Sequence, residues 1–363
     1  MATRIAIIGG FLGAGKTTLI NKIAKGLSED GKTIGLIMND QGEALVDTQY
    51  SKAMGFETSE VLRGCFCCRF NDLMTSARNI VSKTRPDFII AEPVGSCTDL
   101  LATVVAPLKM IYPKEFEVAP LMIVVDAPRL VQEGLDPSTL SGYLRKHQIE
   151  EAEHIVISKI DMVTRDVLLK LVEAAKAYNP QADIIPYSAI TGHGMDRIMS
   201  VVRSGKRSDR LPVDIDYDIY AKAEAELGWY NGEFGFQARE KVDTYDLATK
   251  IIRAISIWYD PADIAHAKLM LTSETNSLKM SAVFDNISID GIKGSRYAQG
   301  NVTVTINARV VSSPEDLRSN IRSSIFEAME SIGIQVEGFK DECFSPSRPN
   351  PTHRIIGSTE MEQ

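Results

Sequence analysis

Residues 4–19 read RIAIIGGFLGAGKTTL, and this stretch decides the fold of the first half of the chain. A short Ile-rich run leads into the pattern G-x-x-x-x-G-K-[ST] at residues 10–17, and an amphipathic stretch follows it. The glycines let the backbone curl so that successive N–H groups face a phosphate, and the following helix adds its dipole. The stretch therefore predicts a strand, a phosphate-binding loop and a helix, and with them a nucleotide site.

The phosphate loop predicts a role for each of its side chains. Lys16 is expected to reach the β- and γ-phosphates, Thr17 to ligate Mg²⁺ and Thr18 to support the α-phosphate. Backbone contacts to the phosphates are expected from Gly10, Gly13, Ala14 and Gly15. The alternative, a chance glycine turn, is disfavoured by the strand–loop–helix context.

Apolar runs and amphipathic stretches alternate through the first two hundred residues. Near-continuous Ile- and Val-rich runs are typical of strands buried on both faces of a parallel sheet. Such runs occupy residues 4–10, 33–38, 87–92, 121–126, 154–158 and 183–188. Helical patterns lie between them, one of them starting at a predicted N-cap, Thr164. The alternation predicts an α/β, doubly wound, mostly parallel-sheet P-loop NTPase domain.

The pattern changes after a charged, proline-bearing stretch at 203–216. We expect a nucleotide domain at 1–205, a linker at 206–216 and a smaller α+β C-terminal domain at 217–363 that binds a client. Asp243 and Ser313 are predicted to cap two helices there. The first helix carries an apolar stripe at Leu247, Ile251, Ile255 and Trp258. Strands are predicted at 266–273, 278–285 and 302–311.

Composition excludes several classes of function. The 363 residues carry a net charge of −8, which argues against nucleic acid or an anionic membrane as the main partner. No apolar run approaches the roughly 18 residues of a membrane span, and the N-terminus does not resemble a signal peptide. Five cysteines, three of them crowded together, favour reduced thiols over a disulfide framework. We therefore expect a cytoplasmic protein.

The crowded thiols are Cys65, Cys67 and Cys68, in the stretch RGCFCCRF at 63–70. Closely spaced thiolates favour Zn²⁺ or another thiophilic metal over Mg²⁺ or Ca²⁺. Arg63 and Arg69 are expected to lower the thiol pKa values. Three thiolates leave a fourth position open, which suits a transferable metal. Packing of the thiols as small hydrophobic groups and redox sensing are the alternatives.

Five stretches together resemble the CobW-like P-loop GTPases with a Cys-x-Cys-Cys signature. They are GFLGAGKTTL (10–19), NDQGEALVD (39–47), GCFCC (64–68), EPVG (92–95) and SKID (158–161). The resemblance covers roughly residues 4–205. It implies hydrolysis of GTP to GDP, coupled to delivery of Zn²⁺ or Co²⁺ to a client protein.

The resemblance implies site residues, and each has a physical reading. Glu92 ends a buried strand, where an acid can hold Mg²⁺ through water or orient the attacking water, and Gly95 lets the backbone approach the γ-phosphate. Lys159 can cover the purine while Asp161 accepts from guanine N1 and N2, which favours GTP over ATP. Ser158 stands where the family usually has Asn. SAITG (188–192) resembles the last base loop, in which the Ala189 N–H would meet guanine O6 and Ser188 is a further nucleotide-binding residue.

The stretch NDQGEALVD departs from the family's usual Asn-Glu-Phe-Gly-Glu. Asp40 remains an oxygen ligand there, and it is expected to order around the γ-phosphate. Glu43, Asp47 and Cys97 are the candidates for the fourth metal position. A solvated acidic loop is the alternative reading of the acids.

The combined interpretation is a GTPase metallochaperone for a metalloprotein or a corrinoid-dependent client, working as a monomer or a nucleotide-dependent homodimer. Some family members serve cobalamin biosynthesis, so the resemblance also implies a corrinoid-related service. Two other functions stay open: a nucleotide-gated binding module, and a thiol-based metal or redox sensor with little turnover.

Overall fold

The computed structural model describes residues 2–39, 46–53, 55–136, 138–284 and 286–356. The chain divides into two compact units, and neither is one contiguous segment. Unit 1 comprises residues 1–41, 55–223 and 348–363, and unit 2 comprises residues 42–54 and 224–347. The expected division at a linker 206–216 differs from this, because a short helix from the first half packs in unit 2 and the chain returns to unit 1 after residue 347.

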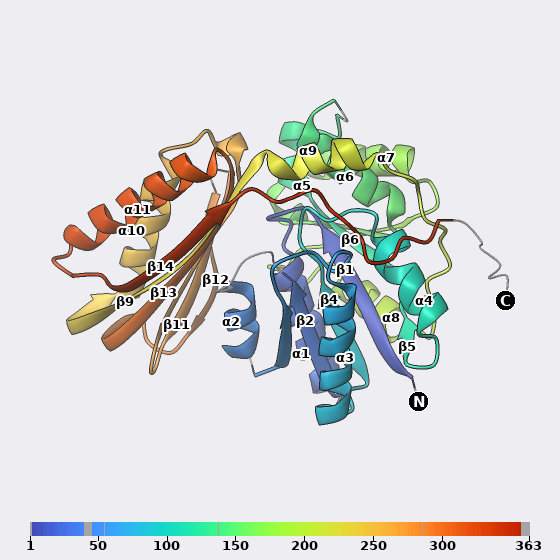
Figure 1. The fold of residues 1–363 in the computed structure, drawn as a ribbon, viewed down its shortest axis with the longest axis horizontal. Coiled ribbons are helices and arrows are strands. Elements are labelled where there is room, and N and C mark those ends of the chain that lie inside the picture. Colours follow the sequence, from blue (N-terminus) through green and yellow to red (C-terminus); the bar gives the residue numbers. More distant parts are fainter. Residues whose placement is uncertain (1, 40–45, 54, 137, 285, 357–363) are drawn as a thin grey trace. The chain divides into compact units, whose positions relative to one another are not determined.

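Unit 1 contains a parallel sheet with the strand order β3-β2-β4-β1-β6-β7-β8, and β5 pairs with β1 beside this path (Figure 1). Its strands are β1 (Thr3–Gly10), β2 (Ile34–Asn39), β3 (Glu57–Val61), β4 (Phe88–Glu92), β5 (Phe116–Val118), β6 (Met122–Asp126), β7 (His154–Ser158) and β8 (Asp183–Pro186). Its helices are α1 (Lys16–Glu29), α3 (Phe70–Thr84), the π-helix Leu101–Val105, α4 (Ala106–Ile111), α5 (Ala127–Glu133), α6 (Leu140–Glu151), the 3₁₀ turn Ile160–Met162, α7 (Arg165–Tyr178) and α8 (Met195–Arg203). Helix α9 (Tyr217–Ala225) leads into unit 2.

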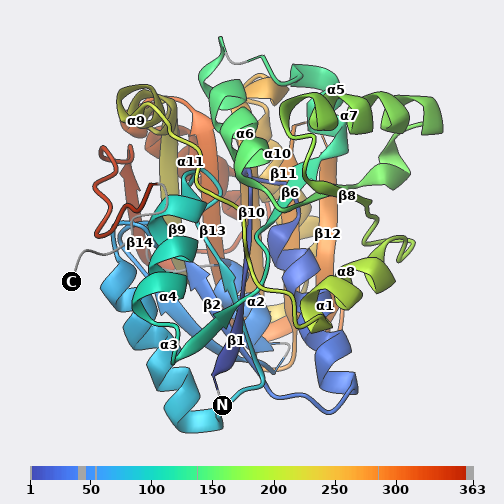
Figure 2. The ribbon, with the colours of Figure 1, turned by 90° about the vertical axis from the view of Figure 1, so that its right-hand side faces the viewer.

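Helices cover both faces of the parallel sheet, as a doubly wound fold requires. Figure 2 shows α1 and α8 on one side of the sheet and α3 and α4 on the other. Ile20 and Ile23 of α1 and Met199 of α8 share one core with buried strand residues such as Val124. The central strands are buried along their length, which explains their near-continuous apolar sequences.

The register of the sheet brings the carboxyl ends of its strands to one edge. Ile7 of β1 lies opposite Ala91 of β4, and Met38 of β2 lies opposite Glu92. Asp126 of β6 pairs with Ser158 of β7. In open α/β sheets ligands bind at this edge, so the loops that follow β1, β4 and β7 lie where a nucleotide site is expected.

Unit 2 contains an antiparallel sheet in the order β12-β11-β10-β13-β9-β14. Its strands are β9 (Leu227–Asp243), β10 (Ile264–Ser273), β11 (Ser277–Val283), β12 (Asn286–Lys293), β13 (Tyr297–Val311) and β14 (Glu337–Phe344). Its helices are α2 (Val46–Ala53), α10 (Thr244–Ser256), the 3₁₀ turn Pro261–Asp263 and α11 (Pro314–Glu330). Asp243 and Ser313 cap α10 and α11 as predicted, whereas Trp258 lies beyond the end of α10 and is 49% exposed.

Alternation along the strands gives the sheet of unit 2 one apolar and one polar face. On β13, residues such as Val304 and Ile306 belong to the core shared with α10 and α11. Thr305 and Asn307 lie between them on the strand and bind residues of α2 instead, Gln49 Oε1 at 3.1 Å and the Val46 N–H at 2.9 Å. Helix α2 therefore packs on the polar face.

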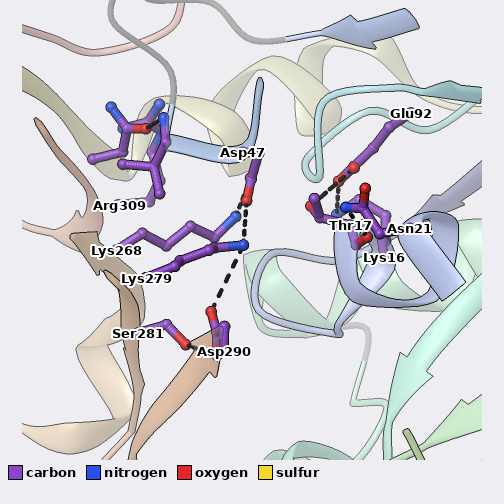
Figure 3. A network of polar contacts seen from close by, with 12 residues as sticks. Lys16, Thr17, Asn21, Asp47, Glu92, Lys268, Lys279, Ser281, Asp290 and Arg309 are labelled. Carbon is purple, nitrogen blue, oxygen red and sulfur yellow. Dashed lines mark hydrogen bonds and ion pairs between the residues drawn. The ribbon is translucent and has the colours of Figure 1, made fainter. Parts of the chain in front are cut away.

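Asp47 of α2 lies at the centre of the polar contact between α2 and the sheet of unit 2 (Figure 3). Its carboxylate binds Lys268 and, at 2.9 Å, Lys279, whose side chain is only 2% exposed. Asp290 lies 3.7 Å from the same Lys279 ammonium. Burial alone would raise the pKa of Asp47, but attraction to Lys268 and Lys279 outweighs burial and holds the pKa well below its usual range.

None of the helices in the described part of the chain combines the length and the apolar character needed to cross a bilayer.

We predict that Asp47→Asn destabilises unit 2 by about 2 kcal/mol, because Lys279 keeps its buried charge and loses its nearer carboxylate. Both tryptophans, Trp229 and Trp258, lie in unit 2, so tryptophan fluorescence during urea unfolding reports on that unit. Asp246→Asn removes an exposed pair with Lys250 and should cost no more than about 0.5 kcal/mol. Equal unfolding midpoints for the two variants would contradict the role given to Asp47.

Candidate nucleotide and metal site

The loop between β1 and α1 has the backbone that the phosphate-loop pattern predicts. Gly10 has φ +128°, and a Cβ there would lie 2.1 Å from the Val124 carbonyl oxygen, so only glycine fits beside β6. Gly13 and Gly15 also have positive φ, and Gly15 directly precedes the first turn of α1. The helix N-terminus therefore presents its backbone N–H groups at the loop.

Lys16 and Thr17 both face Glu92 at the end of the neighbouring strand β4 (Figure 3). The Thr17 hydroxyl lies 2.9 and 3.1 Å from the two carboxylate oxygens, and Lys16 Nζ lies 3.8 Å from one of them. All three residues are buried. A hydroxyl and a carboxylate side by side are oxygen donors of the kind that Mg²⁺ takes, so these residues fit a Mg²⁺–phosphate group.

Gly95 lies against the phosphate loop three residues after Glu92. A Cβ on Gly95 would lie 2.7 Å from the Leu12 side chain and 3.0 Å from the Leu12 backbone nitrogen. The Gln148 amide donates to the Gly95 carbonyl at 3.0 Å and to the Cys97 carbonyl at 2.8 Å, which anchors the loop on α6. The predicted γ-phosphate contact is therefore built into a tightly packed loop.

The predicted base-binding side chains are held by the phosphate loop and by one another. Ser158 Oγ lies 2.8 Å from the Ala14 carbonyl oxygen, and Lys159 Nζ donates to the Gly13 carbonyl at 2.9 Å. Ser188 Oγ donates to Asp161 at 2.5 Å. The hydroxyl of Ser158 thus connects β7 to the phosphate loop although it is shorter than an Asn side chain.

The three crowded thiols form a cluster. Cys65 Sγ lies 2.6 Å from Cys67 Sγ and 3.4 Å from Cys68 Sγ, and the Cys67–Cys68 distance is 3.6 Å. Cys65 and Cys67 are buried and Cys68 is half-buried. Among the described residues, these three are the group whose ligand atoms all lie within 4.8 Å of one another. Three soft donors within 4.8 Å of one another can converge on one thiophilic metal ion.

Hydrogen bonds within the cluster set the thiol pKa values. The pKa of Cys65 is lowered well below its usual value, first by a hydrogen bond from Cys67 and then by those from Cys68 and Cys97. The pKa of Cys67 is raised, and that of Cys68 is raised to about 11, in each case first through the hydrogen bond with Cys65. The pKa values of Cys67 and Cys68 thus rise, opposite to the lowering expected from the flanking arginines, and Arg69 pairs with Asp72 at 2.5 Å.

Asn39 at the end of β2 holds the backbone around the thiols. Its amide donates to the Val61 carbonyl at 2.9 Å and to the Gly64 carbonyl at 2.7 Å. Its side-chain oxygen accepts from the Phe66 N–H at 2.8 Å. The Cys65 carbonyl then accepts from the Arg69 N–H at 2.9 Å, just before α3 begins.

The C-terminal part of the chain crosses the thiol cluster, which the sequence analysis did not predict. The Asn350 N–H donates to Cys68 Sγ at 3.2 Å, and the Thr352 N–H donates to the Cys67 carbonyl at 2.8 Å. The His353 ring packs edge-on against Phe70, with centroids 5.1 Å apart. We call residues 348–356 the C-terminal strap.

Arg354 anchors the strap to the loop after β4. Its guanidinium donates to Asp99 at 2.8 Å and to Asp214 at 2.5 Å. Tyr217 donates to the same Asp99 carboxylate at 2.9 Å. A histidine, an arginine and backbone amides far from the cysteines in sequence thus surround the thiol site, and no local motif indicates them.

The acidic candidates for the metal site have different outcomes. Asp40 and Glu43 lie outside the described residues. The Asp47 carboxylate is engaged by Lys268 and Lys279 within unit 2, and its role as a metal ligand stays a prediction.

A phosphate loop after β1, with its acid at the end of the adjacent β4, defines unit 1 as a P-loop nucleotide-binding domain. Residues 4–186, half of the chain, match the family described as CobW/HypB/UreG, nucleotide-binding domain. The chain belongs to this family, as the resemblance of its loops implied.

Curated relatives carry the names of zinc chaperones and of zinc-regulated GTPases. The zinc chaperone CobW of Sinorhizobium sp. is 31% identical over 181 residues, which are 43% of this chain and 51% of that protein. The zinc chaperone YeiR of Escherichia coli is 29% identical over 166 residues, or 45% of this chain and 48% of that protein. The chain thus spans about half the length of these relatives.

Solved structures that align with the chain include two from related proteins. Zn(II)-bound YjiA GTPase from E. coli aligns at 16% identity and TM-score 0.37, over 89% of this chain and 99% of that chain. HypB from Helicobacter pylori in complex with nickel aligns at 16% identity and TM-score 0.44, over 58% of this chain and 91% of that chain.

Beneath the loop after β4 lies a buried carboxyl group, Glu151. It accepts from the Leu101 N–H at 3.0 Å and from the Thr98 hydroxyl at 3.3 Å. Burial raises the pKa of Glu151 to about 8, and the nearby negative charge of Asp99 contributes to this rise. The folded protein therefore keeps this proton up to about pH 8, while an unfolded chain releases it near the ordinary pKa of 4.5.

We predict that Glu151 makes stability fall as pH rises from about 4.5 to 8, because unfolding releases a proton throughout that range. Glu151→Gln should weaken this dependence, so that the variant gains on the wild type between pH 5.5 and 8.5. The measurement is the urea midpoint at both pH values, with the exposed Glu173→Gln as a control that keeps the wild-type slope. A wild-type slope in Glu151→Gln would contradict the assignment.

Proposed function

We propose that the protein is a GTP-hydrolysing metallochaperone, which holds a thiophilic metal ion at Cys65, Cys67 and Cys68 and passes it to a client protein. Zn²⁺ is the first cargo to test, since the curated relatives include proteins named zinc chaperones, and Co²⁺ is the second. The client is a protein that requires the metal, either a metalloenzyme or a corrinoid-dependent protein.

One observation carries the proposal: a single short loop joins the phosphate site to the thiols. The loop starts at Glu92, which contacts Lys16 and Thr17, and it passes Gly95 beside the phosphate loop. Five residues after Glu92 it reaches Cys97, whose thiol hydrogen-bonds with Cys65 and Cys67. A change at the γ-phosphate therefore has a short covalent path to Cys97, which hydrogen-bonds with two of the metal ligands.

The residues at the phosphate site have distinct tasks in this function. Lys16 would neutralise charge on the β- and γ-phosphate oxygens. Thr17, together with Glu92 through water, would hold Mg²⁺, which supplies further charge neutralisation when it is bound. Glu92 is also placed to orient the attacking water, and the Gly95 backbone to approach the γ-phosphate. These are the groups that the proposal assigns to hydrolysis, with Asp40 as a further oxygen ligand.

The thiols suit a cargo that must be released. Three thiolates leave one position of a tetrahedral metal ion for a further ligand, and a client ligand can enter there. The pKa of Cys65 is lowered well below its usual value, so this thiol gives up its proton to a metal ion most readily of the three. Cys67 and Cys68 hold their protons more tightly and would release them on metal binding.

We predict that the protein prefers guanine nucleotides and that Asp161→Asn moves this preference toward xanthine nucleotides. The Asp161 carboxylate can accept from guanine N1 and N2, whereas an amide also offers a donor to the xanthine O2. Calorimetry with GDP, XDP and ADP measures the change. Ser188 Oγ, which donates to Asp161 at 2.5 Å, can keep the amide oriented. Wild-type protein that binds ADP as tightly as GDP would contradict guanine recognition.

We predict that the wild type binds one Zn²⁺ or Co²⁺ and that the triple variant Cys65→Ser, Cys67→Ser, Cys68→Ser does not. Binding should weaken on acidification, since the ligands must lose protons. A GTP analogue should change the metal affinity by roughly 5- to 150-fold, and metal should change the affinity for the analogue by the same factor. Lys16→Ala should retain metal binding and lose this coupling.

The same titration separates the alternatives. A triple variant with the wild-type Co²⁺ affinity and charge-transfer absorption would exclude the cluster as the metal site. A wild type that binds no metal, but whose thiols oxidise readily, would support a thiol sensor instead.

A further inference from the structure

The loop between β4 and the π-helix, residues 93–100, touches both the phosphate loop and the thiols. Gly95 packs on Leu12 so closely that a Cβ would come within 2.7 Å of the Leu12 side chain. Two residues later, the Cys97 N–H donates to the Val94 carbonyl at 3.0 Å in a tight turn. Gln148 donates to the carbonyls of both Gly95 and Cys97, so one buried amide holds the two residues together.

The side chain of Cys97 is buried beside the thiol cluster. It is only 1% exposed, and its thiol forms hydrogen bonds with those of Cys65 and Cys67. Cys97 therefore adjoins the cluster from a second loop, after β4, while the three sulfur atoms after β3 form the group that lies within 4.8 Å of one another. Cys343, the remaining cysteine, belongs to unit 2.

The other candidates for a fourth ligand are less well placed among the described residues. Asp47 binds two lysines in unit 2. His353 of the C-terminal strap packs its ring on Phe70. The strap approaches Cys68 with the Asn350 N–H, which is a hydrogen-bond donor to sulfur and not a metal ligand.

We propose that Cys97 is the fourth ligand, so that the cargo metal is held by four thiolates, and that Cys97 is the ligand controlled by the nucleotide. This inference rests on the proposed function. Four thiolates complete the tetrahedral shell of Zn²⁺ and make the site closed. Withdrawal of Cys97 leaves three thiolates and one open position, which is the form that can transfer the metal.

The transfer step is a ligand exchange without any redox change. The metal–sulfur bond to Cys97 breaks, and a bond to a thiolate of the client forms in its place. The released Cys97 thiolate takes a proton from solvent, while the client thiol has lost one. The link to the nucleotide is the stretch from Glu92 to Cys97, because any movement of Gly95 at the γ-phosphate is passed to Cys97 through two peptide units and the shared Gln148 amide.

The test uses Co²⁺ as a spectroscopic probe on the full chain, with Cys97→Ser as the variant and Cys343→Ser as the matched control. We expect the wild type and Cys343→Ser to show the same thiolate-to-Co²⁺ absorption. Cys97→Ser should lose about a quarter of this intensity and bind at least tenfold more weakly. A GTP analogue should change the Co²⁺ affinity of the wild type and not that of Cys97→Ser, while both proteins bind the analogue equally.

A second measurement does not depend on how the variant folds. X-ray absorption of the Zn²⁺-loaded wild type should count four Zn–S bonds of about 2.3 Å. Three sulfurs and one lighter ligand, or an unchanged absorption and nucleotide effect in Cys97→Ser, would overturn the role of Cys97 and leave the three-thiol chaperone intact. A wild type without any metal binding would overturn the proposed function itself.

Discussion

The pairing of β1 with β4 is the constraint on which the rest of unit 1 depends. Because Ile7 lies opposite Ala91, β4 ends beside the last residues of β1, and Glu92 meets Lys16 and Thr17 just beyond the phosphate loop. A slip of one residue would turn Glu92 to the other face of the sheet. The same register directs the loop after β4 past the phosphate loop and toward the thiols. The pairing of the strands therefore places the phosphate site and the thiol cluster close together.

The sequence predicted the features that depend on interactions between residues close to one another along the chain. The phosphate loop, the buried parallel strands and the caps Thr164, Asp243 and Ser313 all follow from residues within a few positions of one another, and the structure confirms them. Helix α2 on the sheet of unit 2 and the C-terminal strap on the thiols depend instead on partners some 220 to 280 positions away. The sequence also did not predict the long strand β9, because residues 230–236 in its first half include two glycines, which are unfavourable in strands.

The thiol site shows where proximity in sequence misleads. Arg63 and Arg69 flank the cysteines along the chain, yet the Arg69 side chain pairs with Asp72 and the thiols shift one another's pKa values. Cys97 is almost thirty residues from the cluster and still reaches it. Likewise Asp47 follows the phosphate-sensing segment in sequence, but the charges that matter to it are lysines on a different sheet. For charged groups and thiols, the interaction partner is determined by where the side chain lies in the folded protein and not by its neighbours in the sequence.

The position of the C-terminal strap determines when the thiol site is completed during synthesis of the chain. Cys65, Cys67, Cys68 and Cys97 leave the ribosome early, whereas Asn350 and Thr352, whose N–H groups bind Cys68 Sγ and the Cys67 carbonyl, come more than 250 residues later. At about 5–20 residues per second, that interval lasts roughly 10–50 s. Throughout it, the nascent nucleotide domain lacks the strap's hydrogen bonds to Cys68 Sγ and to the Cys67 carbonyl. Each newly made molecule therefore passes through a period in which the thiol cluster is held by the nucleotide domain alone, before the strap contacts it.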